Sequence, residues 1–251
     1  MNRFRILLAD DHPVFRMGVC ALIQSHEGWE VCGEAADGRE AVKKCIQLRP
    51  DLLILDICMP ILNGVDAARQ ILKHNPEQRI LVLTNVESEQ VIRECLQAGV
   101  CGWVCKSDRA DDLTDAIQAM QNHRSSFSAR VSNLILEGYL QPHRETPLLV
   151  LPPRLSPRER EVVQLVSEGK TSKEIATVLG VSLKTAETHR SNVMIKLKVH
   201  STVELVMYAI RDEIVHVQLP GIALPIPQEG HSLGNVAPTQ RALPVEYSAA
   251  A

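Results

Sequence analysis

The strongest constraint on the fold is a rhythm in the first half of the chain. Short apolar, strand-like runs alternate there with stretches whose apolar residues recur at three-and-four spacing, as in Val91, Ile92, Cys95 and Leu96. The five runs are Ile6–Asp10, Glu30–Glu34, Leu52–Asp56, Ile80–Thr84 and Gly102–Lys106. Continuous apolar runs predict strands that are buried on both faces, so the sheet should be parallel with helices on each side. The predicted fold class is α/β, a doubly wound parallel sheet with (βα)5 order.

The second half changes character. From Leu155 to about Val217 the strand patterns end and helix N-caps of the Ser/Thr-x-x-Glu type begin. These caps are Ser156 with Glu159, Thr171 with Glu174, and Ser201 with Glu204. Glycines at 169 and 180 should end helices. We expect helices near 157–168, 172–179, 183–197 and 202–211, which together make a small all-α domain.

These patterns divide the chain into four parts. Residues 1–124 form the α/β domain, 125–151 a partly helical linker, 152–217 the helical domain and 218–251 a Pro-rich tail that we expect to be disordered. Residues 1–125 carry 14 Lys and Arg against 18 Asp and Glu, whereas residues 152–217 carry 10 against 8. The N-terminal domain is acidic and the helical domain is mildly basic, which suggests that the two domains have different partners.

The composition argues against a membrane protein, a secreted protein and a cysteine-based metal or redox site. No apolar run reaches the length of a membrane span, and the first ten residues lack the pattern of a signal peptide, so we expect a cytoplasmic protein without a membrane partner. The seven cysteines lie in the first half, and no two have the C-x-x-C spacing of a zinc or redox site. We expect them to be reduced and to act as small apolar side chains.

Polar residues stand at four strand ends. Asp10 and Asp11 end the first strand, and Asp56, Thr84 and Lys106 end the third, fourth and fifth. Because these ends meet at one edge of a parallel sheet, the carboxylates should converge and require a divalent cation such as Mg²⁺. The lysine and the threonine hydroxyl could then hold phosphoryl oxygens. Taken singly, each Asp is more often a helix cap, and Asp11 could cap the helix that begins near residue 13.

This half of the chain resembles response-regulator receiver domains, which have a flavodoxin-like fold. The matching residues are Leu8–Pro13, Asp51–Pro60, the pair Asn63-Gly64 and Ala98–Lys106. The resemblance implies that Asp56 is the phospho-acceptor. It also implies that Asp11, Asp56 and the backbone carbonyl of Cys58 ligate Mg²⁺, with Asp10 acting through a water.

The same resemblance assigns the other strand-end residues. Thr84 would grip a phosphoryl oxygen, and Lys106 would pair with the phosphate. Trp103 would be the switch aromatic, at a position where the family commonly has Tyr or Phe. Asn85 stands where the family commonly has a small residue.

The predicted helices 172–179 and 183–197, joined by Gly180 and Val181, have the lengths and the short connection of a helix-turn-helix. Ala186, Val193 and Leu197 face the core of this domain by their spacing. The opposite face carries residue types that bind base edges and phosphates. A polar helix face that is merely solvated is the alternative.

Residues 150–217 are similar to LuxR-type DNA-binding domains, through the segments Leu155–Val163, Gly169–Ala176, Lys184–Arg190 and Glu204–Arg211. The resemblance implies DNA contacts from Lys184, Thr185, Glu187, Thr188, Arg190, Ser191 and Lys196. It also implies dimerisation through the helix that begins near Thr202.

The two resemblances together identify the chain as a member of the NarL/FixJ response regulators. They imply that a cognate histidine kinase phosphorylates Asp56, and that the phosphorylated protein dimerises on promoter DNA and regulates transcription, with RNA polymerase as a further candidate partner. No enzymatic activity beyond the domain's own phosphoryl transfer and dephosphorylation is expected.

Two rival functions remain. One is a Mg²⁺-dependent phosphohydrolase with an aspartyl-phosphate intermediate, which would usually need a second acid two residues after the nucleophile, where this chain has Cys58. The other is a transcription factor whose first domain responds to contact with a protein or a small ligand. The complete set of Asp10, Asp11, Asp56, Thr84 and Lys106 argues against the second rival.

Overall fold

The computed structural model describes residues 3–86, 88–140 and 155–216. Its first part is a parallel sheet in the order β2-β1-β3-β4-β5-β6. The strands are β1 (Phe4–Ala9), β2 (Trp29–Ala35), β3 (Leu52–Leu55), β4 (Arg79–Thr84), β5 (Gly102–Cys105) and β6 (Ser126–Phe127). The first five confirm the predicted strands, and the order reverses direction between β1 and β3, as in a doubly wound sheet.

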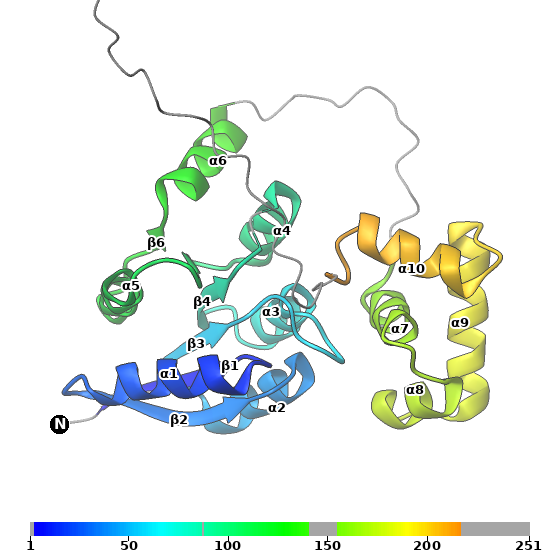
Figure 1. Ribbon diagram of the computed structural model, residues 1–251, viewed down its shortest axis with the longest axis horizontal. Coiled ribbons are helices and arrows are strands. Elements are labelled where there is room, and N and C mark those ends of the chain that lie inside the picture. The colour runs from blue at the N-terminus through cyan, green and yellow to red at the C-terminus, as the bar shows by residue number, and fades with distance from the viewer. Residues whose placement is uncertain (1–2, 87, 141–154, 217–251) are drawn as a thin grey trace, which may run out of the picture. The chain divides into compact units, whose positions relative to one another are not determined.

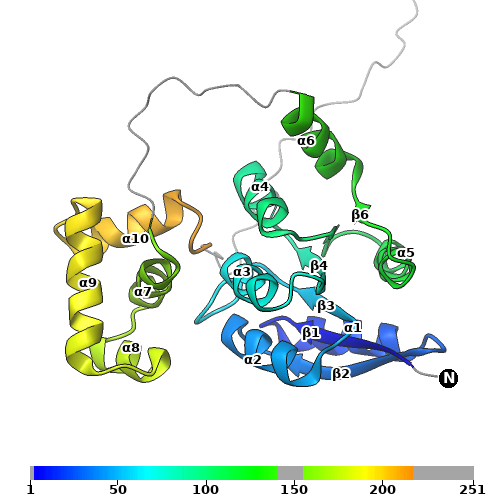
Figure 2. The same ribbon diagram turned by 180° about the vertical axis from the view of Figure 1, so that it is seen from behind.

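Helices cover both faces of this sheet (Figure 1 and Figure 2). One face carries α1 (Pro13–Gln24) and α5 (Ala110–Gln121), and the other carries α2 (Gly38–Leu48), α3 (Gly64–His74) and α4 (Glu89–Ala98). Two apolar clusters fill the layers, one around Ile6, Leu8 and Ile54 and the other around Leu7 and Leu53. Successive residues of β1 therefore enter opposite layers, which explains why the run is apolar without alternation.

A sixth strand and a helix lie in the segment that we predicted as a partly helical linker. β6 pairs Ser126 with Gly102 and Phe127 with Trp103, and α6 (Ala129–Leu140) follows it. Val131 and Leu134 of α6 are buried in the same cluster as Trp103. The first turns of the predicted linker therefore pack against the receiver-like domain, whereas its Pro-rich remainder and the tail lie outside the described residues.

The second part consists of α7 (Pro157–Ser167), α8 (Ser172–Leu179), α9 (Leu183–Leu197) and α10 (Thr202–Arg211), as the caps predicted. Ser156 and Thr171 form capping boxes with Glu159 and Glu174. A core around Val163, Leu165 and Ile175 holds these helices together. Within the described ranges of the chain, no helix is long and apolar enough to cross a membrane.

Candidate functional site

The backbone brings the predicted site residues to one edge of the sheet. Asp56 donates its N–H to Ala9 O at 2.9 Å, and Lys106 donates its N–H to Thr84 O at 3.0 Å, so the ladder bonds of neighbouring strands continue to these positions. Asp10 follows β1 and Thr84 is the last residue of β4. The side chains that the sequence placed at separate strand ends therefore share one site.

Lys106 joins the two innermost carboxylates. Its Nζ lies 2.7 Å from Asp10 Oδ2 and 2.7 Å from Asp56 Oδ2, and the side chains of Asp10 and Asp56 are 1% and 2% exposed. Although burial lowers the pKa of Lys106, the charges and hydrogen bonds of Asp56 and Asp10 more than offset this effect and raise it. The ring of Phe15 lies 4.8 Å from Nζ and adds a cation–π contact. The ammonium group is therefore charged and fixed beside Asp56.

Backbone groups hold the Asp56 carboxylate. Oδ1 accepts the N–H of Ile57 at 2.7 Å and the N–H of Cys58 at 3.3 Å. Cys58, whose carbonyl is the predicted ligand, is therefore held beside the Asp56 carboxylate through its N–H. Burial, with a further contribution from the Asp56 charge, raises the pKa of the Cys58 thiol to about 12, which keeps this sulfur protonated and unreactive at neutral pH.

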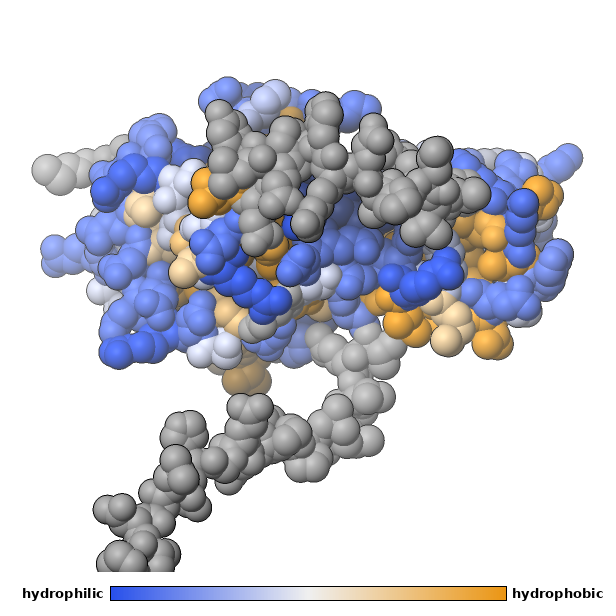
Figure 3. Space-filling model, turned by 90° about the horizontal axis from the view of Figure 1, so that it is seen from above, coloured by the Kyte–Doolittle hydropathy of each residue, from blue (hydrophilic) through white to orange (hydrophobic). Residues whose placement is uncertain are grey.

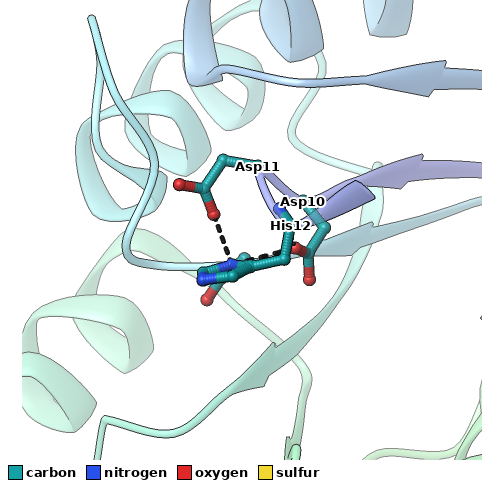
Figure 4. Close-up of side chains that lie close together, drawn as sticks. Asp10, Asp11 and His12 are labelled. Carbon is teal, nitrogen blue, oxygen red and sulfur yellow. Dashed lines mark hydrogen bonds and ion pairs between the residues drawn. The ribbon is translucent and has the colours of Figure 1, made fainter. Parts of the chain in front are cut away.

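The cluster contains one residue that sequence reasoning assigned no role. Asp10, Asp11, His12 and Asp56 each offer a ligand atom within 4.8 Å of the others. His12 Nδ1 lies 2.7 Å from Asp11 Oδ1, and Figure 4 marks this pair with a dashed line. Its position directly after the Asp pair was the available signal. Burial raises the pKa of Asp11; the charges of Asp56 and Asp10 also raise it, and His12 opposes them.

The donor set fits a magnesium ion. Asp10 Oδ2 and Asp11 Oδ1 are buried, and their neighbours at 2.7 Å are a nitrogen of Lys106 and a nitrogen of His12. Carboxylate oxygens that are clustered in this way are the ligands that a hard cation prefers. Burial, and to a smaller extent the charges of Asp56 and Asp10, raises the pKa of Asp11, and a divalent cation would favour its ionised form.

The two predicted switch residues are buried. Thr84 is 1% exposed, and its Oγ1 accepts the N–H of Val86 at 3.3 Å. Trp103 is 5% exposed and belongs to the cluster that also contains Val131 and Leu134 of α6. Trp103 therefore lies in the apolar layer that α6 covers, whereas Thr84 lies at the carboxyl end of β4.

The second candidate site is the outer face of α9. Of the seven predicted DNA-contact residues, five are exposed there. They are Lys184, Thr185, Glu187, Thr188 and Ser191. Arg190 and Lys196 are partly buried, and both have partners within the domain: Arg190 Nη2 donates to Thr202 Oγ1 at 2.8 Å, and Lys196 Nζ lies 2.7 Å from Glu159 Oε2. The structure thus brings five of these residues onto one free surface and engages the other two elsewhere.

The helix-turn-helix geometry follows from local signals. Gly180 ends α8 in the left-handed conformation, with φ at 64°, and Ser182 caps α9 by accepting the N–H of Thr185 at 3.1 Å. Ala186 and Val193 are buried, as their spacing predicted. The remaining faces of α9 are left for solvent or a ligand.

Comparison with known proteins gives matches to both domains. Residues 6–118 match the family described as "Response regulator receiver domain", and residues 153–209 match "Bacterial regulatory proteins, luxR family". The chain is 33% identical over 213 residues to the transcriptional regulatory protein LiaR of Bacillus subtilis, an alignment that covers 84% of this chain and 99% of that protein. It is 31% identical over 211 residues to the response regulator protein VraR of Staphylococcus aureus, covering 84% and 98%.

A solved structure shows the same architecture. RcsB from Salmonella enterica serovar Typhimurium, bound to the promoter rprA in the presence of the phosphomimetic BeF3⁻, matches with a TM-score of 0.51 and 29% identity. The match covers 82% of this chain and 98% of that one.

Proposed function

The chain belongs to the NarL/LuxR-family response regulators and is a DNA-binding regulator of transcription in a two-component system, and we propose that phosphorylation of Asp56 controls its binding to promoters. The observation that carries this proposal is the position of Lys106 Nζ, 2.7 Å from both Asp10 and Asp56 at the carboxyl ends of the strands. An ammonium group fixed beside a buried carboxylate provides the counter-charge that a phosphoryl group on that carboxylate requires.

Each residue of the cluster has its own role in the transfer of the phosphoryl group. An oxygen of Asp56 forms a bond to phosphorus while the phosphorus–nitrogen bond of a phosphohistidine on the cognate kinase breaks, and the released imidazole takes up a proton. Lys106 pairs with the transferred group, and the Thr84 hydroxyl donates to one of its oxygens. Asp11, Asp56 and the Cys58 carbonyl would hold Mg²⁺, with Asp10 acting through a water, and the ion would supply positive charge against the phosphate and the carboxylates.

Exposed apolar residues support the docking of a protein donor near this site. Val14 and Met17 of α1 are 84% and 70% exposed. An apolar hollow between α1 and α5 begins beside them and reaches Lys106. A helix of the kinase that carries the phosphohistidine would cover this surface and bring the phosphorus atom to Asp56.

A second exposed apolar surface supports dimerisation. Val203, Met207 and Ile210 recur at four-and-three spacing on α10 and are 71%, 63% and 37% exposed. In Figure 3, hydrophobic patches interrupt the hydrophilic surface at the right, over the part of the chain that carries α9 and α10. A second copy of α10 would bury this stripe and present two α9 helices to DNA, as in two-fold symmetric readers of the major groove.

The relatives support the DNA-binding part of the proposal. RcsB was solved on a promoter in the presence of a phosphomimetic. For this chain we propose binding in the major groove through the exposed face of α9, action in the cytoplasm, and contact with RNA polymerase at the promoter. Hydrolysis of the acyl phosphate by the receiver domain itself would reset the switch.

The proposal is tested by selection of genomic DNA fragments. The purified protein is incubated with fragments, with and without beryllofluoride and Mg²⁺, and Asp56→Asn serves as the matched variant. Enrichment of specific fragments only with the mimic, and only for the wild type, is the expected result. Equal enrichment under both conditions would mean that Asp56 does not control binding.

A further inference from the structure

A cavity lies at the edge of the sheet opposite to the phosphorylation site. It has a volume of about 390 Å³ and opens between the C-terminal ends of α2 and α3, which pack side by side on one face of the sheet (Figure 1 and Figure 2). We refer to it as the α2–α3 cavity, and its lining includes Cys45, Ile46, Arg49, Ile71, His74 and Gln78. Pro50, which also lines it, precedes β3, whereas Asp56 follows β3, so about 20 Å of extended chain separate the cavity from the acceptor carboxylate. A ligand in the cavity would not contact Asp56.

The inner wall of the cavity is apolar. Cys45 and Ile71, which are 4% and 2% exposed, belong to the apolar cluster that also contains residues of the sheet. Burial raises the pKa of the Cys45 thiol to about 12, so this sulfur stays protonated at neutral pH. Ile46 lines the cavity as well and is 41% exposed. The interior therefore suits the hydrocarbon part of a ligand.

One buried side chain in the lining leaves a hydrogen-bond acceptor unused. Gln78 is 6% exposed, and its Nε2 donates to Pro50 O and to Arg79 O, both at 3.2 Å. These bonds fix the orientation of the amide. Its Oε1 accepts no hydrogen bond from the residues that the structure describes. Because Gln78 lines the cavity, water or an O–H or N–H group of a ligand must supply the donor.

Arg49 ends α2 in a backbone conformation that favours glycine. Its φ is 47°, in the left-handed region, and its N–H donates to Cys45 O. Glycine occupies the equivalent C-cap positions of α4 and α8, at Gly99 and Gly180. An arginine adopts this region only with backbone strain, and strained residues of this kind cluster at functional sites. The guanidinium lines the cavity, and the described ranges of the chain offer it neither a hydrogen bond nor an ion pair.

Two more donors line the cavity beside Arg49. His74 is the last residue of α3 and Asn75 is its C-cap residue, and both are exposed. The imidazole of His74 and Nδ2 of Asn75 have no hydrogen-bond partner in the described part of the chain. None of the described residues that line the cavity is acidic. Three donors, one of them always charged, therefore surround a space without a carboxylate, which is an arrangement that binds an acid group.

We propose that the α2–α3 cavity binds a small hydroxylated carboxylic acid. The carboxylate of the ligand pairs with the guanidinium of Arg49 and accepts from His74, its hydrocarbon body covers Cys45 and Ile71, and its hydroxyl donates to Gln78 Oε1. The volume of the cavity lies at the small end of the range for ligand sites, about 300 to 1,000 Å³. The site goes beyond the control by phosphorylation, because its ligand binds at the other edge of the sheet and does not compete with a phosphoryl group.

Matched probes and variants separate the contacts. The probes 3-hydroxybenzoate and 4-hydroxybenzoate carry both groups on an apolar ring at two different separations; benzoate lacks the hydroxyl, and 4-hydroxybenzyl alcohol lacks the carboxylate. Arg49→Gly removes the guanidinium and places glycine in the conformation that suits it, so the variant should fold at least as well as the wild type. Lys43→Ala is the control, because Lys43 is an exposed cation of the same helix that does not line the cavity.

The experiment is a titration of the full chain followed by amide NMR shifts. At least one hydroxybenzoate should shift the amides of Arg49, His74 and Gln78 in a saturable manner, with a Kd of about 1 mM or lower, while the amides next to Asp56 stay in place. Benzoate should bind about tenfold more weakly, and 4-hydroxybenzyl alcohol should not saturate. Arg49→Gly should lower the affinity at least about tenfold, and Lys43→Ala should leave it unchanged. Thermal unfolding confirms that each variant folds.

Three results would overturn the proposal. Neither hydroxybenzoate shifts the amides around the cavity at saturable concentrations, or the shifts gather around Asp56, which would mean that the acid binds beside Lys106 instead. Arg49→Gly and Lys43→Ala weaken binding equally, which would reduce the effect to general attraction between charges. Benzoate binds as tightly as the hydroxybenzoates, which would remove the role of Gln78. None of these results bears on the phosphorylation of Asp56, which is measured separately.

Discussion

The Nζ atom of Lys106 lies 2.7 Å from Oδ2 of Asp56, and both side chains are less than a tenth exposed. The charge of Lys106 stabilises both the unphosphorylated and the phosphorylated protein. Before phosphorylation it compensates the charges of buried carboxylates, and afterwards it compensates the phosphoryl group. Its removal should therefore affect stability as well as phosphorylation.

Lys106→Ala should lower the free energy of unfolding of the metal-free protein by about 3 kcal/mol at neutral pH, because it leaves two buried carboxylates without their cation. Since the folded-state pKa of Lys106 is raised, its contribution is fully present below its unfolded pKa, near 10.5, and is lost as the pH rises through the folded value. Urea unfolding at pH 7 and at pH 11 measures this effect. A wild-type protein that loses no more stability than the variant between these two pH values would contradict the argument.

Asp11→Asn should stabilise the metal-free protein at neutral pH while weakening the binding of Mg²⁺. Burial raises the pKa of Asp11, so its ionised form is disfavoured in the folded state. Below the unfolded pKa of 3.8, Asp11 is protonated in both states and does not lower the free energy of unfolding. As the pH rises through the raised pKa of the folded state, ionisation of Asp11 lowers the free energy of unfolding. Asn cannot ionise, so the variant does not have this loss of stability at pH 7. Melting temperatures with and without millimolar Mg²⁺ should show a smaller metal-dependent increase for the variant.

Sequence reasoning located the acidic site because parallel strands bring their carboxyl ends together regardless of side-chain detail, so Asp10, Asp56 and Lys106 could be placed before any distance was known. It located α7 and α8 because capping boxes are local. It did not find β6, since a strand of two residues has no periodicity and exists only through pairing with Gly102 and Trp103.

Local patterns also fail where another partner lies within reach. Glu204 follows Ser201 at capping-box spacing, and Ser201 accepts its N–H as expected, but the Glu204 carboxylate accepts the N–H of the neighbouring His200 at 2.7 Å. Lys196 has the charge of a DNA contact, yet Glu159 of α7 pairs with it. The second pair joins residues far apart in the chain, and the sequence pattern of α9 alone does not specify it.

The pairing of Lys196 predicts that two lysines of α9 behave differently. Lys184 is exposed, so Lys184→Ala should lower the affinity for DNA and reduce the slope of log K against log salt by about 0.9. Lys196→Ala should leave the slope nearly unchanged and instead lower the melting temperature of the protein, because it breaks an ion pair between α7 and α9. Fluorescence anisotropy over a salt series, together with thermal unfolding, separates the two effects. Equal changes in slope would show that Lys196 leaves Glu159 to bind a phosphate.

The exposed stripe on α10 predicts a variant that folds but does not dimerise. Met207 is 63% exposed, so Met207→Glu should leave the melting temperature within a few degrees of wild type. In a dimer the new carboxylates would be buried against apolar side chains, which costs several kcal/mol and corresponds to a loss of more than about 100-fold in dimer affinity.

Sedimentation with beryllofluoride and Mg²⁺ measures the outcome, and Met207→Leu, which keeps the surface apolar, is the matched control. DNA with one half-site should bind Met207→Glu as it binds the wild type, whereas DNA with two half-sites should lose the gain in affinity that dimerisation gives. A Met207→Glu protein that still dimerises with the mimic would exclude α10 as the interface, and other exposed apolar residues, such as Val14 and Met17 of α1, would be tested next.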